Sequence, residues 1–110
     1  MVARRLASEG WTILEQNLMW GRREIDLVVR RGSLLAFVEV KTRSGAGYGG
    51  PEGAVTRKKR REIEAVAAGY LASRPTLGVA VRFDVIAIVC DDARRIVSYT
   101  HIEDAWRPEA

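Results

Sequence analysis

Residues 24–42, EIDLVVRRGSLLAFVEVKT, decide the fold of this chain. Apolar residues alternate with charged ones from Glu24 to Arg30, which is typical of a β-strand. The residues from Leu34 to Thr42 predict a second strand, and they are apolar enough to indicate a central position in a sheet. The sequence Arg31-Gly32-Ser33 between the two strands predicts a tight turn. The stretch is therefore expected to form a β-hairpin.

Four charged side chains of this hairpin are predicted to converge. Because side chains alternate between the two faces of a strand, Glu24 and Asp26 share one face of the first strand. By the same rule, Glu39 and Lys41 share one face of the second strand. Opposed residues on one face of a hairpin lie about 4.5–5.5 Å apart, so three carboxylates and one ammonium can meet at one point. On the other face of the first strand we expect Ile25, Leu27 and Val29.

The rest of the chain predicts two helices and three more strands. Before the hairpin we expect a helix over Ala3 to Glu9 that ends at Gly10, a strand over Trp11 to Gln16, and a connection over Asn17 to Arg23. After the hairpin we expect a glycine-rich loop over Ser44 to Gly53 and then a helix from the N-cap Thr56 to about Arg74, which Pro75 and Gly78 end. The last two expected strands run over Val79 to Val89 and Ile96 to Ile102. Core spacing in the second helix falls on Ile63, Val66, Ala67, Tyr70 and Leu71. We therefore expect one α/β domain over residues 1–110.

Composition limits the class of protein. The 110 residues are 47% hydrophobic and 29% charged, as in an ordinary globular domain. The formal charge of +4 and the pI near 9.7 favour a polyanionic partner, either nucleic acid or acidic lipid, although a solvated basic surface is equally common. Cys90 is the single cysteine, so neither an intrachain disulfide nor a cysteine metal cluster can form. Without an 18-residue apolar run or a secretory signal, we expect a cytoplasmic protein and no membrane partner.

The convergent carboxylates indicate a metal site. Carboxylates inside apolar strands are costly unless they are paired or bind a cation, and Mg²⁺ (or Mn²⁺) commonly takes one or two carboxylates together with water and phosphate oxygens. Such an ion polarises a phosphoryl oxygen and supplies a hydroxide nucleophile, as phosphodiester hydrolysis requires. Lys41 would add positive charge beside the attacked phosphate. The alternative is a set of salt bridges in which Glu24 or Glu39 pairs with Lys41.

A run of five cations begins the second helix. The positive end of a helix dipole disfavours each cation there by about 0.3–1 kcal/mol, so the run suggests a bound polyanion such as the DNA backbone. Arg22, Arg23 and Arg43 could extend the same phosphate track. The alternative is a solvated basic turn. The residues of the run are Arg57, Lys58, Lys59, Arg60 and Arg61.

Three segments together resemble a known family. The segments Glu24-Ile-Asp26-Leu, Phe37-Val-Glu39-Val-Lys41 and Arg82-Phe-Asp84-Val are similar to those of the YraN-like proteins (UPF0102), small bacterial endonuclease-like proteins. That family is placed in the PD-(D/E)XK nuclease superfamily and resembles archaeal Holliday-junction resolvases. The resemblance implies a restriction-endonuclease-like mixed β-sheet flanked by helices. It also implies a metal-dependent endonuclease that cuts DNA, with branched DNA as a candidate substrate.

The resemblance also implies roles for individual residues. Asp26 and Glu39 would be the metal ligands, Lys41 the catalytic lysine and Glu24 an accessory acid. Lys58 would be a basic residue facing the site. The family's Gly-Glu pair of the first helix would fall before Met1, which favours the alternative of a nucleic-acid-binding module with weak or no catalysis. By analogy with cutters of branched DNA, which need two sites, a homodimer is expected.

Two polar residues near the C-terminal end have simpler interpretations. Asp84 lies between apolar residues, and we expect it to pair with Arg82 or with a backbone amide. His101 is the single histidine, and we expect it at the surface without a catalytic role.

Overall fold

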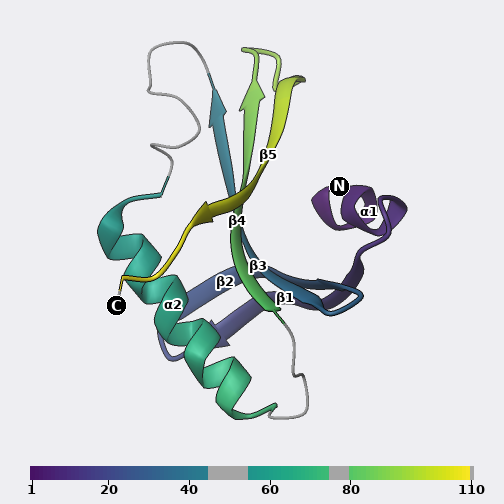
Figure 1. Ribbon diagram of the computed structural model, residues 1–110. Helices are drawn as coiled ribbons and strands as arrows, with labels where there is room; N and C mark the ends of the chain where they lie inside the picture. Colours follow the sequence, from purple (N-terminus) through teal and green to yellow (C-terminus); the bar gives the residue numbers. More distant parts are fainter. Residues whose placement is uncertain (45–54, 75–79, 110) are drawn as a thin grey trace.

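The computed structural model describes residues 1–44, 55–74 and 80–109. Its elements are α1 (Val2–Ser8), β1 (Thr12–Trp20), β2 (Arg23–Arg31), β3 (Leu34–Ser44), α2 (Arg57–Ala72), β4 (Ala80–Cys90) and β5 (Ile96–Trp106) (Figure 1). The five strands form one sheet in the order β1-β2-β3-β4-β5. All neighbours are antiparallel except β3 and β4, which are parallel and flank α2 in the chain. The predicted element order and the α/β class with a mixed sheet are confirmed.

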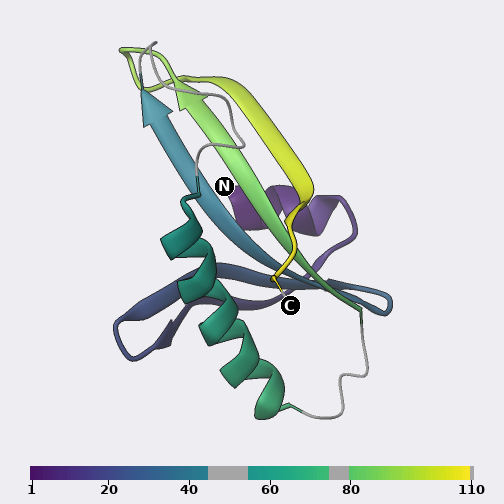
Figure 2. The same ribbon diagram turned by 60° about the vertical axis from the view of Figure 1, so that its left-hand side comes forward.

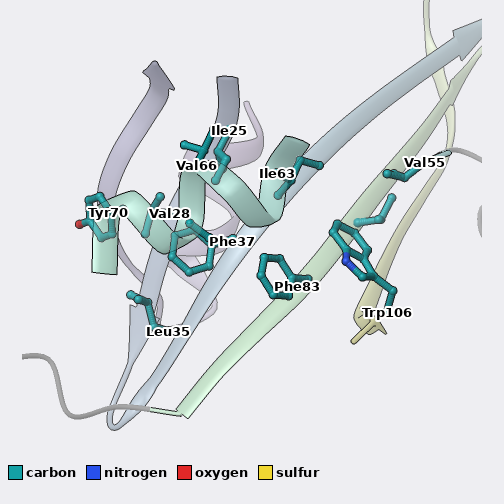
Figure 3. Close-up of a cluster of buried hydrophobic side chains, with 12 residues drawn as sticks. Ile25, Val28, Leu35, Phe37, Val55, Ile63, Val66, Tyr70, Phe83 and Trp106 are labelled. Atoms are coloured by element: carbon teal, nitrogen blue, oxygen red, sulfur yellow. The ribbon is translucent and has the colours of Figure 1, made fainter. Parts of the chain in front are cut away.

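The two helices lie on opposite faces of this sheet (Figures 1 and 2). The first core lies under α2, where Phe83 stacks between Phe37 and Trp106 with ring centroids 5.7 and 5.1 Å away (Figure 3). The second core lies under α1 and includes the fully buried Leu6 and the nearly buried Trp11. Because β3 is the third of five strands, its side chains from Leu35 to Glu39 are buried on both faces, as its apolar sequence predicts.

The second helix begins where the sequence predicts. The side chain of Thr56 caps it by accepting a hydrogen bond from the backbone N–H of Lys59 at 3.1 Å. Its buried residues are those predicted, with Leu71 partly buried beside them: Ile63, Val66, Ala67 and Tyr70. The helix ends at Ala72, and the predicted stop at Pro75 and Gly78 lies outside the described residues.

The first strand is longer than the sequence predicts. The segment from Asn17 to Arg23, predicted as a connection, is mostly strand, because the pairing of β1 with β2 continues to Trp20 opposite Arg23. Asn17 lies within β1 although it has a positive φ of 53°, and the turn itself is confined to Gly21 and Arg22, where Gly21 has φ 64°. The predicted loop over 44–53 lies outside the described residues except for Ser44, which ends β3.

The alternation of β2 breaks beside Asp26. Ile25 packs with Val28 in the core under α2, whereas Leu27 and Val29 pack in the core under α1. The prediction that Ile25 shares a face with Leu27 is therefore wrong. The backbone ladder between β2 and β3 extends only to Leu27 opposite Val38. Beyond that pair β2 is released from the regular pleat, and Ile25 turns toward α2.

In the described part of the chain, neither helix has the length and apolar character needed to span a bilayer.

Candidate functional site

The four charged residues of the predicted hairpin site meet under the N-terminal end of α2. Asp26 lies at hydrogen-bonding distance from the carboxyl groups of both Glu24 and Glu39. Lys41 Nζ lies 4.0 Å from Glu39 Oε2, and a further cation, Lys59 Nζ, lies 3.7 Å from the same atom. The structure thus brings together three carboxylates and two ammonium groups from β2, β3 and α2.

Asp26 is the central acceptor of the cluster. Its Oδ2 accepts the backbone N–H of Val40 at 2.7 Å, which takes the place of a ladder bond where β2 leaves β3. Burial alone would raise the pKa of Asp26, but hydrogen bonds with Glu39, with the Val40 amide and with Glu24 hold that pKa below its ordinary value. Asp26 is therefore the ionised member of the group.

Glu39 is the buried member of the cluster, with 5% of its surface exposed. The pKa of Glu39 is raised to about 8. Burial is the largest cause, and the hydrogen bond with Asp26 and the negative charge of Asp26 add to it. Glu39 Oε2 accepts no hydrogen bond from the described residues, and Lys59 Nζ and Lys41 Nζ lie 3.7 and 4.0 Å from it. At neutral pH Glu39 therefore keeps its proton beside the ionised Asp26, and its buried Oε2 accepts no hydrogen bond from the described residues.

Glu24 lies at the outer side of the cluster and is half-buried. Its hydrogen bond to Asp26, then burial and the charge of Asp26, raise its pKa. Glu24 thus touches Asp26 and has more contact with solvent than Glu39, which suits an accessory acid at the rim of the site.

Lys59 is a residue of the site that the sequence interpretation did not place beside the carboxylates. The resemblance put Lys58 toward the site, but Lys58 is exposed and its neighbour Lys59 reaches Glu39. The helical spacing holds the signal that identifies it. Lys59 precedes the buried residues Ile63 and Val66 by four and seven positions, so it occupies the first place of the stripe that α2 turns toward the sheet.

The five-cation run is therefore not one uniform surface. Arg57 is bound by Glu109 through two hydrogen bonds of 2.7 Å. Arg60 donates to the backbone carbonyl of Val55 at 3.1 Å and lies 5.5 Å from the Trp106 ring centre. A groove of about 340 Å³ between α2 and the start of β2 is lined by Arg23, Arg57, Lys58, Arg61 and Glu62. Three members of the run thus share a concave basic surface with Arg23, while Lys59 and Arg60 point elsewhere.

Arg43 lies at the end of β3, two residues beyond Lys41, and is exposed. The register of β3 with β4 continues without a break from Glu39 through Arg43, so these alternate residues follow one face of the strand. Arg43 therefore extends the positive charge of the site along β3.

Asp84 belongs to a separate, fully satisfied network on the other face of the sheet. Arg82 donates to it through Nε and Nη2 at 2.8 and 2.9 Å, the Asp104 amide donates at 3.0 Å, and His101 Nε2 lies 2.8 Å away. The expected pairing with Arg82 and a backbone amide is confirmed. The prediction of a surface His101 is wrong, because 15% of its side chain is exposed and it binds the buried carboxylate.

The hydrogen-bond partners of the buried Asp84 carboxylate stabilise its ionised form. Burial would raise its pKa, but the hydrogen bonds from His101, Arg82 and the Asp104 amide hold that pKa below its ordinary value. These hydrogen bonds all come from β4 and β5, which suits a structural role. The network fixes the two strands across the register shift between Phe83 and Val85.

Asp26 and Glu39 are the two residues of the cluster that could hold a small divalent cation. Within residues 1–44, 55–74 and 80–109 there is no group of three or more Asp, Glu, His or Cys side chains that could hold a metal ion. Mg²⁺ usually requires only one or two carboxylates and completes its shell with water and phosphate oxygens. Asp26 and Glu39 form such a pair, and the buried Glu39 Oε2 has no hydrogen-bond donor among the described residues.

Comparison with known proteins identifies relatives across most of the chain. A family model described as "Uncharacterised protein family UPF0102" matches residues 1–88. The chain is 44% identical over 110 residues to the UPF0102 protein of Chlorobaculum tepidum, an alignment that covers 96% of this chain and 85% of the relative. It is 45% identical over 98 residues to that of Geobacter sulfurreducens, with 87% and 74% covered, and 39% identical over 101 residues to that of Moorella thermoacetica, with 92% and 84% covered.

Proposed function

We propose that this chain, which belongs to the uncharacterised protein family UPF0102, is a metal-dependent endonuclease that hydrolyses phosphodiester bonds of DNA. One observation carries the proposal. A buried carboxyl, Glu39, lies between Asp26 on one side and two lysine ammonium groups on the other, with an oxygen that accepts no hydrogen bond from the described residues. Buried charged groups are costly to desolvate and contribute little to stability on average, so a cation and an anionic substrate are suitable occupants of this cluster.

Each residue has a distinct task in this reaction. Asp26 and Glu39 would hold Mg²⁺ or Mn²⁺, and the Val40 amide fixes the Asp26 carboxylate. When bound, the ion would polarise the phosphoryl oxygen and make a water molecule nucleophilic near neutral pH. Lys41 places its ammonium beside Glu39, where it would stabilise negative charge that develops on the phosphate. Glu24 helps to hold Asp26 in place from the rim.

The basic groove supports nucleic acid as the substrate. Arg23, Arg57, Lys58 and Arg61 line it at the end of α2 that also delivers Lys59 to the carboxylates. Contacts of this kind hold a phosphate backbone in register without reading its sequence. A strand bound in the groove would present a neighbouring phosphate to Asp26 and Glu39. Arg43 would extend the same track along β3.

The topology supports a restriction-endonuclease-like fold as part of the same proposal. An antiparallel β1-β2-β3 meander carries the acidic residues, and a helix then connects β3 to the parallel strand β4. The helix returns its first turn to the charged part of β3. Sequence resemblance to PD-(D/E)XK nucleases suggested the same architecture.

A cleavage screen tests the function directly. The protein would be incubated with linear duplex, single-stranded, closed circular, flapped and four-way DNA in Mg²⁺, Mn²⁺ or EDTA. We expect cleavage of at least one substrate with either metal and none in EDTA. Glu39→Ala and Lys41→Ala should each abolish it, and wild-type cleavage in either variant would indicate a contaminating nuclease.

A second candidate function is nucleic-acid binding without catalysis. It is favoured by two features that reduce the negative charge of the cluster without a metal: the proton that Glu39 keeps at neutral pH, and the nearby ammonium of Lys59. DNA binding by the wild type in every metal, with no cleavage of any substrate in the screen, would select this alternative.

A further inference from the structure

Two lysines approach the same oxygen of Glu39 from different elements. Lys41 is carried by β3, two residues from Glu39, and its Nζ lies 4.0 Å from Oε2. Lys59 is carried by the first turn of α2, and its Nζ lies 3.7 Å from Oε2. The ammonium from the helix is therefore at least as close to the buried carboxyl as the ammonium that the sequence interpretation assigned to catalysis.

We propose that Lys59 is a second catalytic lysine of this site, which contacts the reacting phosphate and stabilises the negative charge that develops during hydrolysis. This inference rests on the proposed nuclease function, and it removes Lys59 from the set of cations that track the DNA backbone. It also makes α2 a catalytic element, in addition to its role in covering the sheet.

The position of Lys59 is fixed by the helix cap that precedes it and by the buried residues that follow it. The Thr56 side chain accepts the Lys59 amide at 3.1 Å, which anchors the first turn of α2. Four and seven residues later, Ile63 and Val66 are buried against the sheet, so the Lys59 side chain is directed along the same helix face. Its side chain is 32% exposed, compared with 68% for Arg57 in the same turn. The helix therefore turns Lys59 inward and Arg57 outward.

Lys59 reaches the cluster from the helix side. Its Nζ lies 3.7 Å from Oε2 of Glu39, the buried carboxyl of the cluster. A phosphate that approaches Asp26 and Glu39 would therefore meet Lys59 directly.

The reaction requires no proton from Lys59. Water adds to phosphorus, the bond from phosphorus to the leaving sugar oxygen breaks, and one proton of the water passes through solvent to that oxygen. Lys59 keeps its charge throughout and acts on the phosphate oxygens. Loss of one preorganised group of this kind typically lowers kcat by about 10²–10³-fold.

The test separates catalysis from backbone binding. Lys59→Gln should lower the single-turnover rate at saturating DNA about 10²-fold, and because the DNA is saturating, a loss of affinity alone cannot produce this fall. Lys58→Gln, which removes an exposed cation of the groove, should reduce the slope of log affinity against log salt, measured in EDTA, by about 0.9. Lys59→Arg, which keeps the charge, should recover part of the rate. Arg4→Gln on the exposed side of α1 controls for the loss of one positive charge and should leave rate and slope unchanged.

The outcomes distinguish this inference from the proposed function. Wild-type cleavage that is lost in Glu39→Ala but retained in Lys59→Gln would overturn the inference alone. So would a reduced salt slope in Lys59→Gln together with a normal rate at saturation, since Lys59 would then be a backbone contact. Absence of cleavage by the wild type with every metal would overturn the nuclease proposal itself, and the catalytic role of Lys59 with it.

Discussion

Asp26 Oδ2 accepts the backbone N–H of Val40 at 2.7 Å, so a side chain rather than a main-chain carbonyl joins β2 to β3 at this point. The bond replaces a missing rung of the ladder and leaves the Asp26 carboxylate beside Glu39, the residue before Val40. The same irregularity that ends the regular sheet therefore builds the site. Functional residues often lie at such breaks, because a regular pleat cannot direct neighbouring side chains toward one point.

The raised pKa of Glu39 predicts how the metal-free protein responds to pH. Between the ordinary value of 4.5 and about 8 the unfolded chain loses this proton while the folded chain keeps it. The free energy of unfolding should therefore fall as pH rises through this range, by up to about 1.4 kcal/mol per pH unit, and level off above it. Glu39→Gln should flatten the profile, as measured by urea unfolding from pH 5 to 9 in EDTA. A profile in Glu39→Gln as steep as that of the wild type would contradict the assignment.

Asp84 should contribute stability with the opposite dependence on pH. Its pKa is lowered on folding, so its contribution is present above its ordinary value of 3.8 and is lost as pH falls through the folded pKa. Asp84→Asn leaves Arg82 and His101 without their buried partner and should cost about 3–5 kcal/mol at pH 7. Thermal or urea unfolding measures the loss.

A surface carboxylate on the next strand provides the control for that experiment. Asp104 pairs with the exposed Arg107, and Asp104→Asn should change stability by no more than about 1 kcal/mol. Equal losses in Asp84→Asn and Asp104→Asn would show that the buried network is not a special source of stability.

Gly69 in α2 should resist the substitution that usually stabilises a helix. An added Cβ would lie 2.8 Å from the Trp20 ring, so the ring must move. In a Trp20→Ala background, Gly69→Ala should gain about 1 kcal/mol from helix propensity, whereas in the wild type this gain should be absent or reversed. A double-mutant cycle on the free energy of unfolding measures the difference. Equal effects in both backgrounds would mean that Trp20 does not pack on Gly69.

Much of the site could be predicted because regular strands carry it. Glu39 and Lys41 lie in a ladder with β4 that has no irregularity, so simple alternation places them on one face. Ile25 could not be placed in this way, because its direction depends on where the β2–β3 ladder ends. That end is set by a hydrogen bond between Asp26 and Val40, fourteen residues apart, which no local pattern contains.

Long-range partners explain the remaining errors. His101 looks like a surface residue because its partner Asp84 is seventeen residues away on the neighbouring strand. Lys59 looks like one cation among five, and only the phase of the buried stripe of α2 separates it from Lys58. The phase of α2 indicates that Lys59 faces the sheet, but the identity of its partner Glu39, like that of Asp84 for His101, depends on the three-dimensional arrangement.

Metal binding without substrate gives the most direct test of the site. A ligand that binds only the folded state stabilises it by about 2.7 kcal/mol at a hundredfold excess over Kd, and each kcal/mol raises the Tm of a small domain by roughly 4–8 °C. Because Glu39 must lose its proton to bind the ion, the apparent affinity for Mg²⁺ or Mn²⁺ should rise about tenfold per pH unit below about 8 and then become constant. The wild type should thus show a saturable increase in Tm that grows from pH 6 to 8.

Asp26→Asn, which removes one of the two ligands at nearly constant shape, should lose this increase, and Asp92→Asn on the exposed turn after β4 should keep it. If metal raised the Tm of Asp26→Asn as much as that of the wild type, the ion would bind elsewhere on the protein. A wild-type Tm unaffected by millimolar Mg²⁺ and Mn²⁺ at pH 8 would contradict a metal site formed by Asp26 and Glu39 alone.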